Sequence, residues 1–236
     1  MTPPVVLAIA ATDPGGGAGL AADLATFAAL GVHGACVVTA VTVQDTLGVH
    51  AVHPLPAELV AAQIAAVLDD LPVAVVKTGM LASAEIVEVV VASVASRSLS
   101  QGRPRLVVDP VLRASTGTEL ADEEVRRAYR DLLIPVATVV TPNEDEFAAL
   151  GRPDQPGVVV TRGGDIETTN DHGTGCTYAS ALAAYLAHGT DIPTAAARAA
   201  AYVTRQLNLS RPWDLGRGRG PVAHISTSPI TEGVTP

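Results

Sequence analysis

The chain has 236 residues, of which 48% are hydrophobic and 17% charged, so it can build the large core of a single α/β domain over residues 1–236. Its formal net charge of −9 argues against nucleic acid or an anionic membrane as the main partner. Two cysteines exclude a disulfide framework. Because no leader opens the chain and no apolar run could cross a bilayer, we expect a cytoplasmic protein.

The first half of the chain alternates short apolar runs with amphipathic stretches. The run Val5–Ala10 lies between prolines and the glycine-rich turn that starts at Asp13, which predicts a buried strand. A helix should follow over 19–30, where leucines and a phenylalanine recur near a period of 3.6 residues. Further strands are expected over 35–43 and 73–76, and further helices from Pro56 and over 84–94.

The second half continues the alternation and adds helix-start signals. Asp122 is a good N-cap, and Asn143 with Glu146 three residues later matches a capping box. Strands are expected over 106–108, 138–140 and 158–160, helices over 175–188 and 193–208, and a loop over 215–221. Alternating strands and helices with short connections predict a doubly wound parallel sheet, whose ligands bind beyond the carboxyl ends of its strands.

Polar residues stand where five of these strands end, namely at Asp13, Lys77, Asp109, Asn143 and Arg162. We expect them to line one edge of the sheet, although each also has a purely structural explanation. Asp109 could close a strand or hold Mg²⁺, often through water. Arg162 could be a surface cation or grip a phosphate.

The stretch 171–177, Asp-His-Gly-Thr-Gly-Cys-Thr, precedes an apolar run and predicts a loop that turns into a buried helix. The first turn of a helix offers free N–H groups to an anion such as phosphate, and its field should lower the pKa of the Cys176 thiol. A glycine-rich linker before a core helix is the alternative. His172 is more readily a hydrogen-bonding loop residue than a metal ligand, and mid-strand Cys36 should be core.

The turn at 15–19 does not match the dinucleotide-binding fingerprint, because Leu20 replaces its final glycine. It does not match a P-loop either, because the P-loop lysine is absent. Asp23, one turn into the next helix, could be an exposed carboxylate or accept a hydrogen bond from a substrate hydroxyl. Gln44 could pair with the edge of a heterocycle or belong to a turn.

Several blocks in order give the chain a resemblance to a known family. They are 13–19 with Asp23, 39–44, 77–81, 108–111, 141–143 with Glu146, 163–164, 172–177 and 218–222. With a cysteine in the Gly-Thr-Gly-Cys loop, they resemble the hydroxymethylpyrimidine/phosphomethylpyrimidine kinases of thiamine biosynthesis, in the ribokinase-like superfamily. The resemblance implies a three-layer α/β/α sandwich with a mostly parallel sheet.

The resemblance also implies an activity: ATP-dependent phosphorylation of 4-amino-5-hydroxymethyl-2-methylpyrimidine and then of its monophosphate, with Mg²⁺, by a homodimer. The implied catalytic residues are Cys176 as base, Gly173, Thr174 and Gly175 as anion hole, and Arg162, which stands where the family usually has lysine. The implied pyrimidine contacts are Gly17, Asp23, Gln44 and Met80. ATP would meet Lys77, Asp109, Asn143, Gly164 and Thr174, and the metal would meet Asp109 and Glu146.

Two departures from the family leave other functions open. The chain is short between the helix that begins near Asn143 and the strand before Gly163, and again over 165–171. The second region lies beside the nucleotide in the family, so its loss would weaken adenine binding. The alternatives are a pyridoxal/pyridoxine-type kinase and a catalytically impaired pyrimidine-binding homologue.

Overall fold

A five-stranded parallel sheet forms the centre of the molecule. The computed structural model describes residues 2–96, 104–164 and 166–225. The strand order is β2-β1-β5-β6-β7, and every pairing is parallel. The strands are β1 (Val5–Ala10), β2 (His33–Val38), β5 (Val73–Thr78), β6 (Arg105–Val108) and β7 (Val139–Val140).

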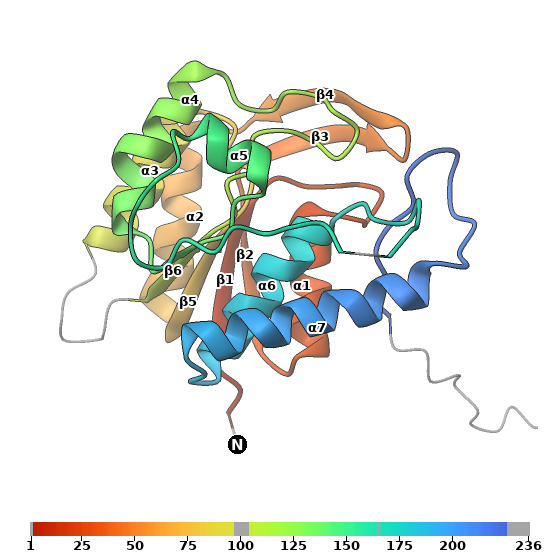
Figure 1. The fold of residues 1–236 in the computed structure, drawn as a ribbon. Coiled ribbons are helices and arrows are strands. Elements are labelled where there is room, and N and C mark those ends of the chain that lie inside the picture. Colours follow the sequence, from red (N-terminus) through yellow and green to blue (C-terminus); the bar gives the residue numbers. More distant parts are fainter. Residues whose placement is uncertain (1, 97–103, 165, 226–236) are drawn as a thin grey trace, which may run out of the picture.

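Helices cover both faces of this sheet, which gives the expected three layers (Figure 1). One layer contains α2 (Ala57–Asp70), α3 (Ala84–Ala95) and α4 (Glu123–Ala128), the last continued by the single turns η1 (Tyr129–Leu133) and η2 (Ile134–Val136). The other contains α1 (Gly19–Ala29), α6 (Thr174–Ala187) and α7 (Ile192–Ser210). The short α5 (Glu144–Ala149) follows β7 near the top of the view.

The alternation of side chains along β1 explains why both faces are covered. Leu7 and Ile9 belong to the apolar cluster beneath α2 and α3. Val6 and Ala8 belong to the cluster beneath α1 and α6. A strand buried on both faces must be apolar throughout, as a parallel sheet requires. In the part of the chain that the structure describes, no helix is long and apolar enough to cross a membrane.

The expected strand over 35–43 is wrong as a single element. β2 ends at Val38, and β3 (Ala40–Asp45) leaves the sheet and pairs antiparallel with β4 (Gly48–Pro54), which the sequence analysis did not predict. Thr39 makes the break: its N–H donates to the Ala10 carbonyl, and its hydroxyl donates to the Met80 carbonyl. The hairpin therefore lies beyond the carboxyl ends of the strands (Figure 1).

Two smaller expectations are also wrong. Residues 158–160 form no strand of their own, only an isolated parallel bridge from Val158 to Val140. Cys36 is exposed rather than core; it lies on β2, an edge strand of the sheet. The remaining expected helices are confirmed, with the Asp122 cap and the Asn143–Glu146 capping box in place.

Candidate active site

A cavity of about 530 Å³ lies at the carboxyl ends of the central strands. Its walls come from the turn after β1, the β3–β4 hairpin, the loop after β6, α5 and the first turn of α6. Of the residues chosen from the sequence, those that line it are Asp13, Gln44, Met80, Asp109, Asn143, Glu146, His172, Gly173, Gly175 and Cys176. Three of the five polar strand ends, Asp13, Asp109 and Asn143, therefore converge on this cavity, as expected of a parallel sheet.

The turn after β1 is built around the buried carboxylate of Asp13. Its oxygens accept hydrogen bonds from the backbone N–H groups of Gly15, Gly17 and Ala18, at 2.9, 3.2 and 2.8 Å. His172 Nε2 lies 2.8 Å from Asp13 Oδ2. Burial works against the charged form, but the contacts with His172 and the backbone outweigh it and lower the pKa of Asp13. The group is a carboxylate at neutral pH.

Two glycines let this turn meet the loop before α6. A Cβ on Gly17 would lie 2.5 Å from His172 Cδ2. Gly173 is the N-cap of α6 with a φ of 85°, and a Cβ there would collide with the Gly17 carbonyl oxygen. A side chain at either position would separate the two loops. Gly17, expected to touch the pyrimidine, makes room for the His172 ring.

The first turn of α6 faces the cavity with its N–H groups. Gly175 and Cys176 have no intrahelical acceptors at this end of the helix. Gly175 lies beside Asp109, because a Cβ built on it would be 4.0 Å from Asp109 Oδ1. Thr174 turns its hydroxyl back to the Asp171 carbonyl, and its side chain stays out of the cavity wall. Gly175 and Cys176 thus provide amides that are available to an anion.

The expected low pKa of the Cys176 thiol is wrong. Burial raises the pKa of this thiol to about 12, with further repulsion from Asp109 and Asp23, although Lys77 acts in the opposite direction. The helix end and the lysine therefore do not compensate for the loss of water around the sulfur. Without ligands, the residue is a neutral thiol.

A buried lysine and its carboxylate partners lie below the floor of the cavity. Lys77 and Asp23 are fully buried, and Lys77 Nζ donates to Asp23 Oδ1 at 2.8 Å. Ser180 Oγ donates to the same oxygen at 2.6 Å, and Asp109 Oδ2 lies 3.8 Å from Nζ. The carboxylates outweigh burial and raise the pKa of Lys77, so it remains charged. Neither Asp23 nor Lys77 lines the cavity.

Two carboxyl groups face the cavity with raised pKa values. Burial is the largest cause for both, raising the pKa of Asp109 to about 6 and that of Glu146 to about 7, and each is further raised by a neighbouring carboxylate. Among the described residues, buried Asp109 Oδ2 has no hydrogen-bond partner, and its nearest cation is Lys77 Nζ at 3.8 Å. Such a pair fits a cation. In the described residues no cluster of three or more ligands forms a ready metal site, so Mg²⁺ would need oxygens from a substrate and water.

Arg162 and Gly164 lie apart from this cavity. The Arg162 side chain is 80% exposed, and its Nε is 3.1 Å from Glu144 Oε1 at the start of α5. Gly164 is exposed and has open space around it. The two residues follow Thr161, which pairs with Asn143 by a single bridge instead of a strand.

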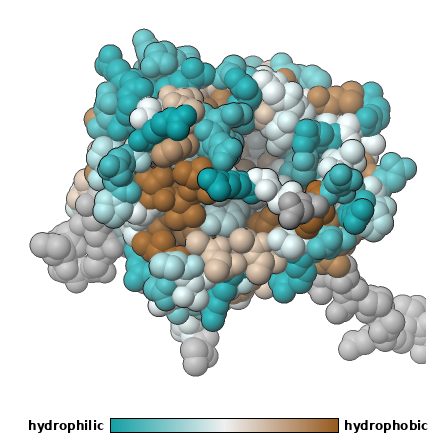
Figure 2. Space-filling view, viewed as in Figure 1, coloured by the Kyte–Doolittle hydropathy of each residue, from teal (hydrophilic) through white to brown (hydrophobic). Residues whose placement is uncertain are grey.

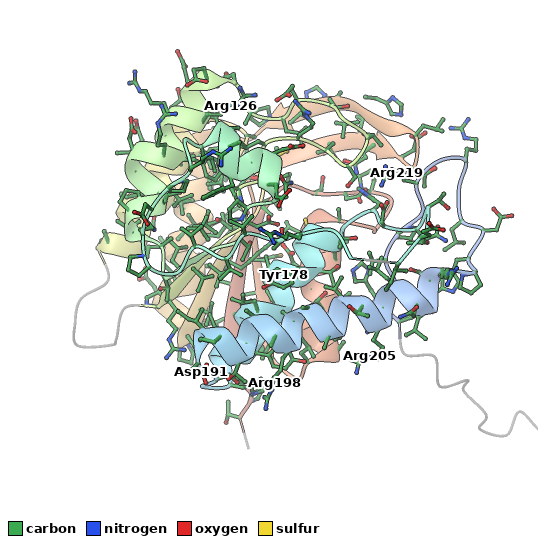
Figure 3. The ribbon with its side chains drawn as sticks, in the orientation of Figure 1. Arg126, Tyr178, Asp191, Arg198, Arg205 and Arg219 are labelled. Carbon is green, nitrogen blue, oxygen red and sulfur yellow. The ribbon has the colours of Figure 1, made fainter. Side chains whose placement is uncertain are left out.

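Several functional candidates escaped the sequence analysis. Ser180 follows Cys176 by one helical turn, and that spacing could have shown that both face the sheet. Arg113 and Arg126 line the cavity mouth, where Glu119 pairs with both. Figure 3 shows Arg126 at the top of the molecule, far from Arg198 and Arg205 on α7. Nothing in the sequence around Arg113 and Arg126 distinguished them from surface cations.

Comparisons with known proteins show the family to which the chain belongs. A family model described as phosphomethylpyrimidine kinase matches residues 13–158 and 153–223. A hydroxymethylpyrimidine/phosphomethylpyrimidine kinase from Synechococcus elongatus is 40% identical over 266 residues, covering 95% of this chain and 98% of the relative. That span exceeds the chain's own 236 residues, so the alignment places insertions in the relative.

Solved structures give the same result. A phosphomethylpyrimidine kinase from Clostridium difficile is 33% identical with a TM-score of 0.71, covering 86% of this chain and 98% of its own. A pyridoxal kinase from Staphylococcus aureus, in complex with AMP-PCP and pyridoxal, is 27% identical with a TM-score of 0.81, covering 98% and 96%. The chain is a kinase with a ribokinase-like fold, and it belongs to the phosphomethylpyrimidine kinase family.

Proposed function

We propose that the protein transfers the γ-phosphoryl group of ATP to the hydroxymethyl oxygen of 4-amino-5-hydroxymethyl-2-methylpyrimidine, and then phosphorylates the monophosphate. One observation carries the proposal: the free amides of α6 open into the same cavity as Gln44 and Met80. A phosphoryl group held at the amides would therefore be next to a ring held at the opposite wall.

Charge stabilisation by the amides does most of the chemical work in this proposal. Phosphoryl transfer has a loose transition state, in which positioning and electrostatics dominate. The thiolate form of Cys176, whose own proton has passed to solvent, takes the proton of the attacking hydroxyl as the new O–P bond forms, and the residue becomes a neutral thiol. Lys77, below the sulfur, favours the thiolate form that can accept this proton. Asp23 and Ser180 keep Lys77 in place, so we assign Asp23 and Lys77 positioning roles in place of direct substrate or ATP contact.

Asp109 and Glu146 are the proposed holders of Mg²⁺, together with the ATP phosphates and water. The ion would supply charge neutralisation at the phosphates. The unpartnered Asp109 Oδ2 and the raised pKa values of both groups support this assignment. Asn143, which caps α5 beside them, lies within reach of the same phosphates.

The proposal extends to Arg162 and Gly164 at the outer side of the site. Glu144 is the ion-pair partner of the exposed Arg162 guanidinium in the described structure. An exposed pair contributes little stability, so a phosphate could replace Glu144 at little cost. Thr174 stays assigned to ATP through its position in the first turn of α6.

A homodimer is also proposed, with the β3–β4 hairpin at the interface. Val41, Val43 and Leu47 of this hairpin are each about half exposed. Figure 2 shows one small apolar patch among hydrophilic residues on the upper right. Clustered exposed apolar side chains are typical of contact surfaces.

A pyridoxal-type kinase is the second candidate, because structures similar to this chain bind pyridoxal. The deciding experiment is an ATP-consumption assay with the hydroxymethylpyrimidine, its monophosphate and pyridoxal as separate acceptors. We expect the two pyrimidines to be phosphorylated far faster than pyridoxal. Faster turnover of pyridoxal would reverse the assignment, and pyrimidine binding without any ATP consumption would favour an impaired homologue.

A further inference from the structure

The His172 ring lies between a fixed carboxylate and the glutamine that faces the cavity. Its Nε2 is 2.8 Å from Asp13 Oδ2 and 3.0 Å from the atom placed as the Gln44 amide nitrogen, Nε2. The Nδ1 side faces Ser115 Oγ at 3.5 Å. The His172 backbone is held by hydrogen bonds with Gly220 and Val222. This ring is therefore fixed from several sides.

The charge of Asp13 decides which atom of His172 carries a proton. The carboxylate already accepts three backbone N–H bonds, and an ionised carboxylate can only accept. The His172 nitrogen that faces it must therefore be an N–H donor. The same Nε2–H is the group that the Gln44 amide meets.

That donor in turn fixes the direction of the Gln44 amide. The oxygen and nitrogen of a glutamine amide have almost the same shape, so the hydrogen-bond network decides which one faces the ring. With Nε2 as a donor, the amide oxygen must face His172, because the opposite choice brings two N–H groups together. The amide NH₂ is then directed away from His172, and the oxygen keeps a second lone pair for another donor.

We propose that His172, held by Asp13, is a specificity-determining residue that fixes the Gln44 amide in one orientation and so selects a ring edge with an amino donor beside an acceptor nitrogen. The inference rests on the proposed function, since 4-amino-5-hydroxymethyl-2-methylpyrimidine carries this edge. The corresponding pyrimidin-4-one carries the reverse order, an oxygen acceptor beside a ring N–H. It would need Gln44 to turn its NH₂ toward the His172 N–H.

The test compares the affinities of the 4-aminopyrimidine and the 4-pyrimidinone by calorimetry, in wild type, His172→Phe and His172→Gln. Phenylalanine removes the donor, so the amide can turn, and the affinity ratio should move toward the pyrimidinone about tenfold, the value of one hydrogen bond. His172→Gln offers Asp13 and Gln44 an N–H at a similar place and should keep the wild-type ratio. A ratio unchanged in His172→Phe, or changed equally in His172→Gln, would overturn the inference.

A second comparison separates this role from a general loss of structure. In a Gln44→Ala background, His172→Phe should leave the ratio unchanged, because the residue that reads the ring edge is gone. A further tenfold change there would contradict the coupling. Each ratio is measured within one protein preparation, so a partly unfolded variant does not distort it.

The proposed function and this inference can fail independently of each other. If wild type prefers the 4-aminopyrimidine by calorimetry but consumes no ATP with it, the kinase proposal fails and the inference stands. If turnover is normal and the His172→Phe ratio is unchanged, the inference alone fails. A wild type that binds neither ring overturns both.

Discussion

Gly175 and Cys176 are adjacent residues whose contributions to catalysis can be separated. A Cβ on Gly175 meets only Asp109 Oδ1, at 4.0 Å, so Gly175→Ala should fold normally while placing a methyl group where the phosphoryl group approaches. We expect it to lower kcat on the order of 100-fold, as the loss of an anion-hole donor does. Cys176→Ala should lower kcat less, because a thiol with a pKa of about 12 is hardly ionised at neutral pH and the loose transition state needs little help from a base.

Steady-state kinetics of Gly175→Ala and Cys176→Ala with the hydroxymethylpyrimidine show which of the two substitutions lowers kcat more. Gly163→Ala is a suitable control, since that glycine has open space around it and lies outside the cavity wall. A larger loss in Cys176→Ala than in Gly175→Ala would show that proton transfer, rather than charge stabilisation, limits the reaction.

At the scale of elements, Asn170 joins the end of α7 to the loop that carries His172. This side chain is buried, and its Nδ2 donates to the carbonyls of Ser210 and Trp213 at 2.8 and 2.9 Å. Asn170→Ala would remove the Asn170 donor from both carbonyls, although the Ser210 carbonyl keeps the Trp213 N–H. We expect a loss of about 2–3 kcal/mol in the free energy of unfolding, together with a higher KM for the pyrimidine because the His172 loop loosens.

Chemical denaturation and steady-state kinetics test both parts of this expectation. Asn208→Ala is the matched control. Asn208 lies on α7, is exposed, and donates one hydrogen bond to the Thr204 carbonyl. Equal destabilisation by the two substitutions would mean that the buried bonds of Asn170 do not support the loop.

At the scale of the whole molecule, two carboxyl groups make stability depend on pH. Burial raises the pKa of Asp109 to about 6 and that of Glu146 to about 7. The folded state therefore binds these protons more tightly than the unfolded state, and stability decreases as the pH rises from about 4 to 7. In the absence of ligands, lowering the pH from 7.5 to 5.5 should raise the Tm by about 4 °C through these two groups.

His224 acts in the opposite direction, because burial lowers its pKa. The folded state therefore binds this proton less tightly than the unfolded state, and stability decreases as the pH falls below the usual pKa of histidine. The comparison with Glu146→Gln isolates the carboxyl effect. We expect this variant to gain less Tm on acidification than wild type in differential scanning calorimetry. An equal gain would assign the pH dependence to other groups.

The sequence predicted most of the architecture because its signals are local. Continuous apolar strands, helix caps and the position of polar residues at strand ends were enough for the parallel sheet and for much of the cavity wall. The break at Thr39 was not predictable, since the apolar pattern continues through it and the cause is a pair of hydrogen bonds to Ala10 and Met80. The burial of Lys77 and the distance of Arg162 from the cavity likewise depend on packing between distant segments.

The different surroundings of the two thiols affect how the enzyme could be inhibited covalently. Cys36 is exposed on an edge strand, whereas Cys176 lies at the cavity floor with its pKa raised to about 12. Only about one molecule in 10⁵ would carry a Cys176 thiolate at neutral pH. An electrophile chosen for reactivity alone would therefore alkylate Cys36 first. A selective warhead would have to dock in the pyrimidine cavity before it reacts.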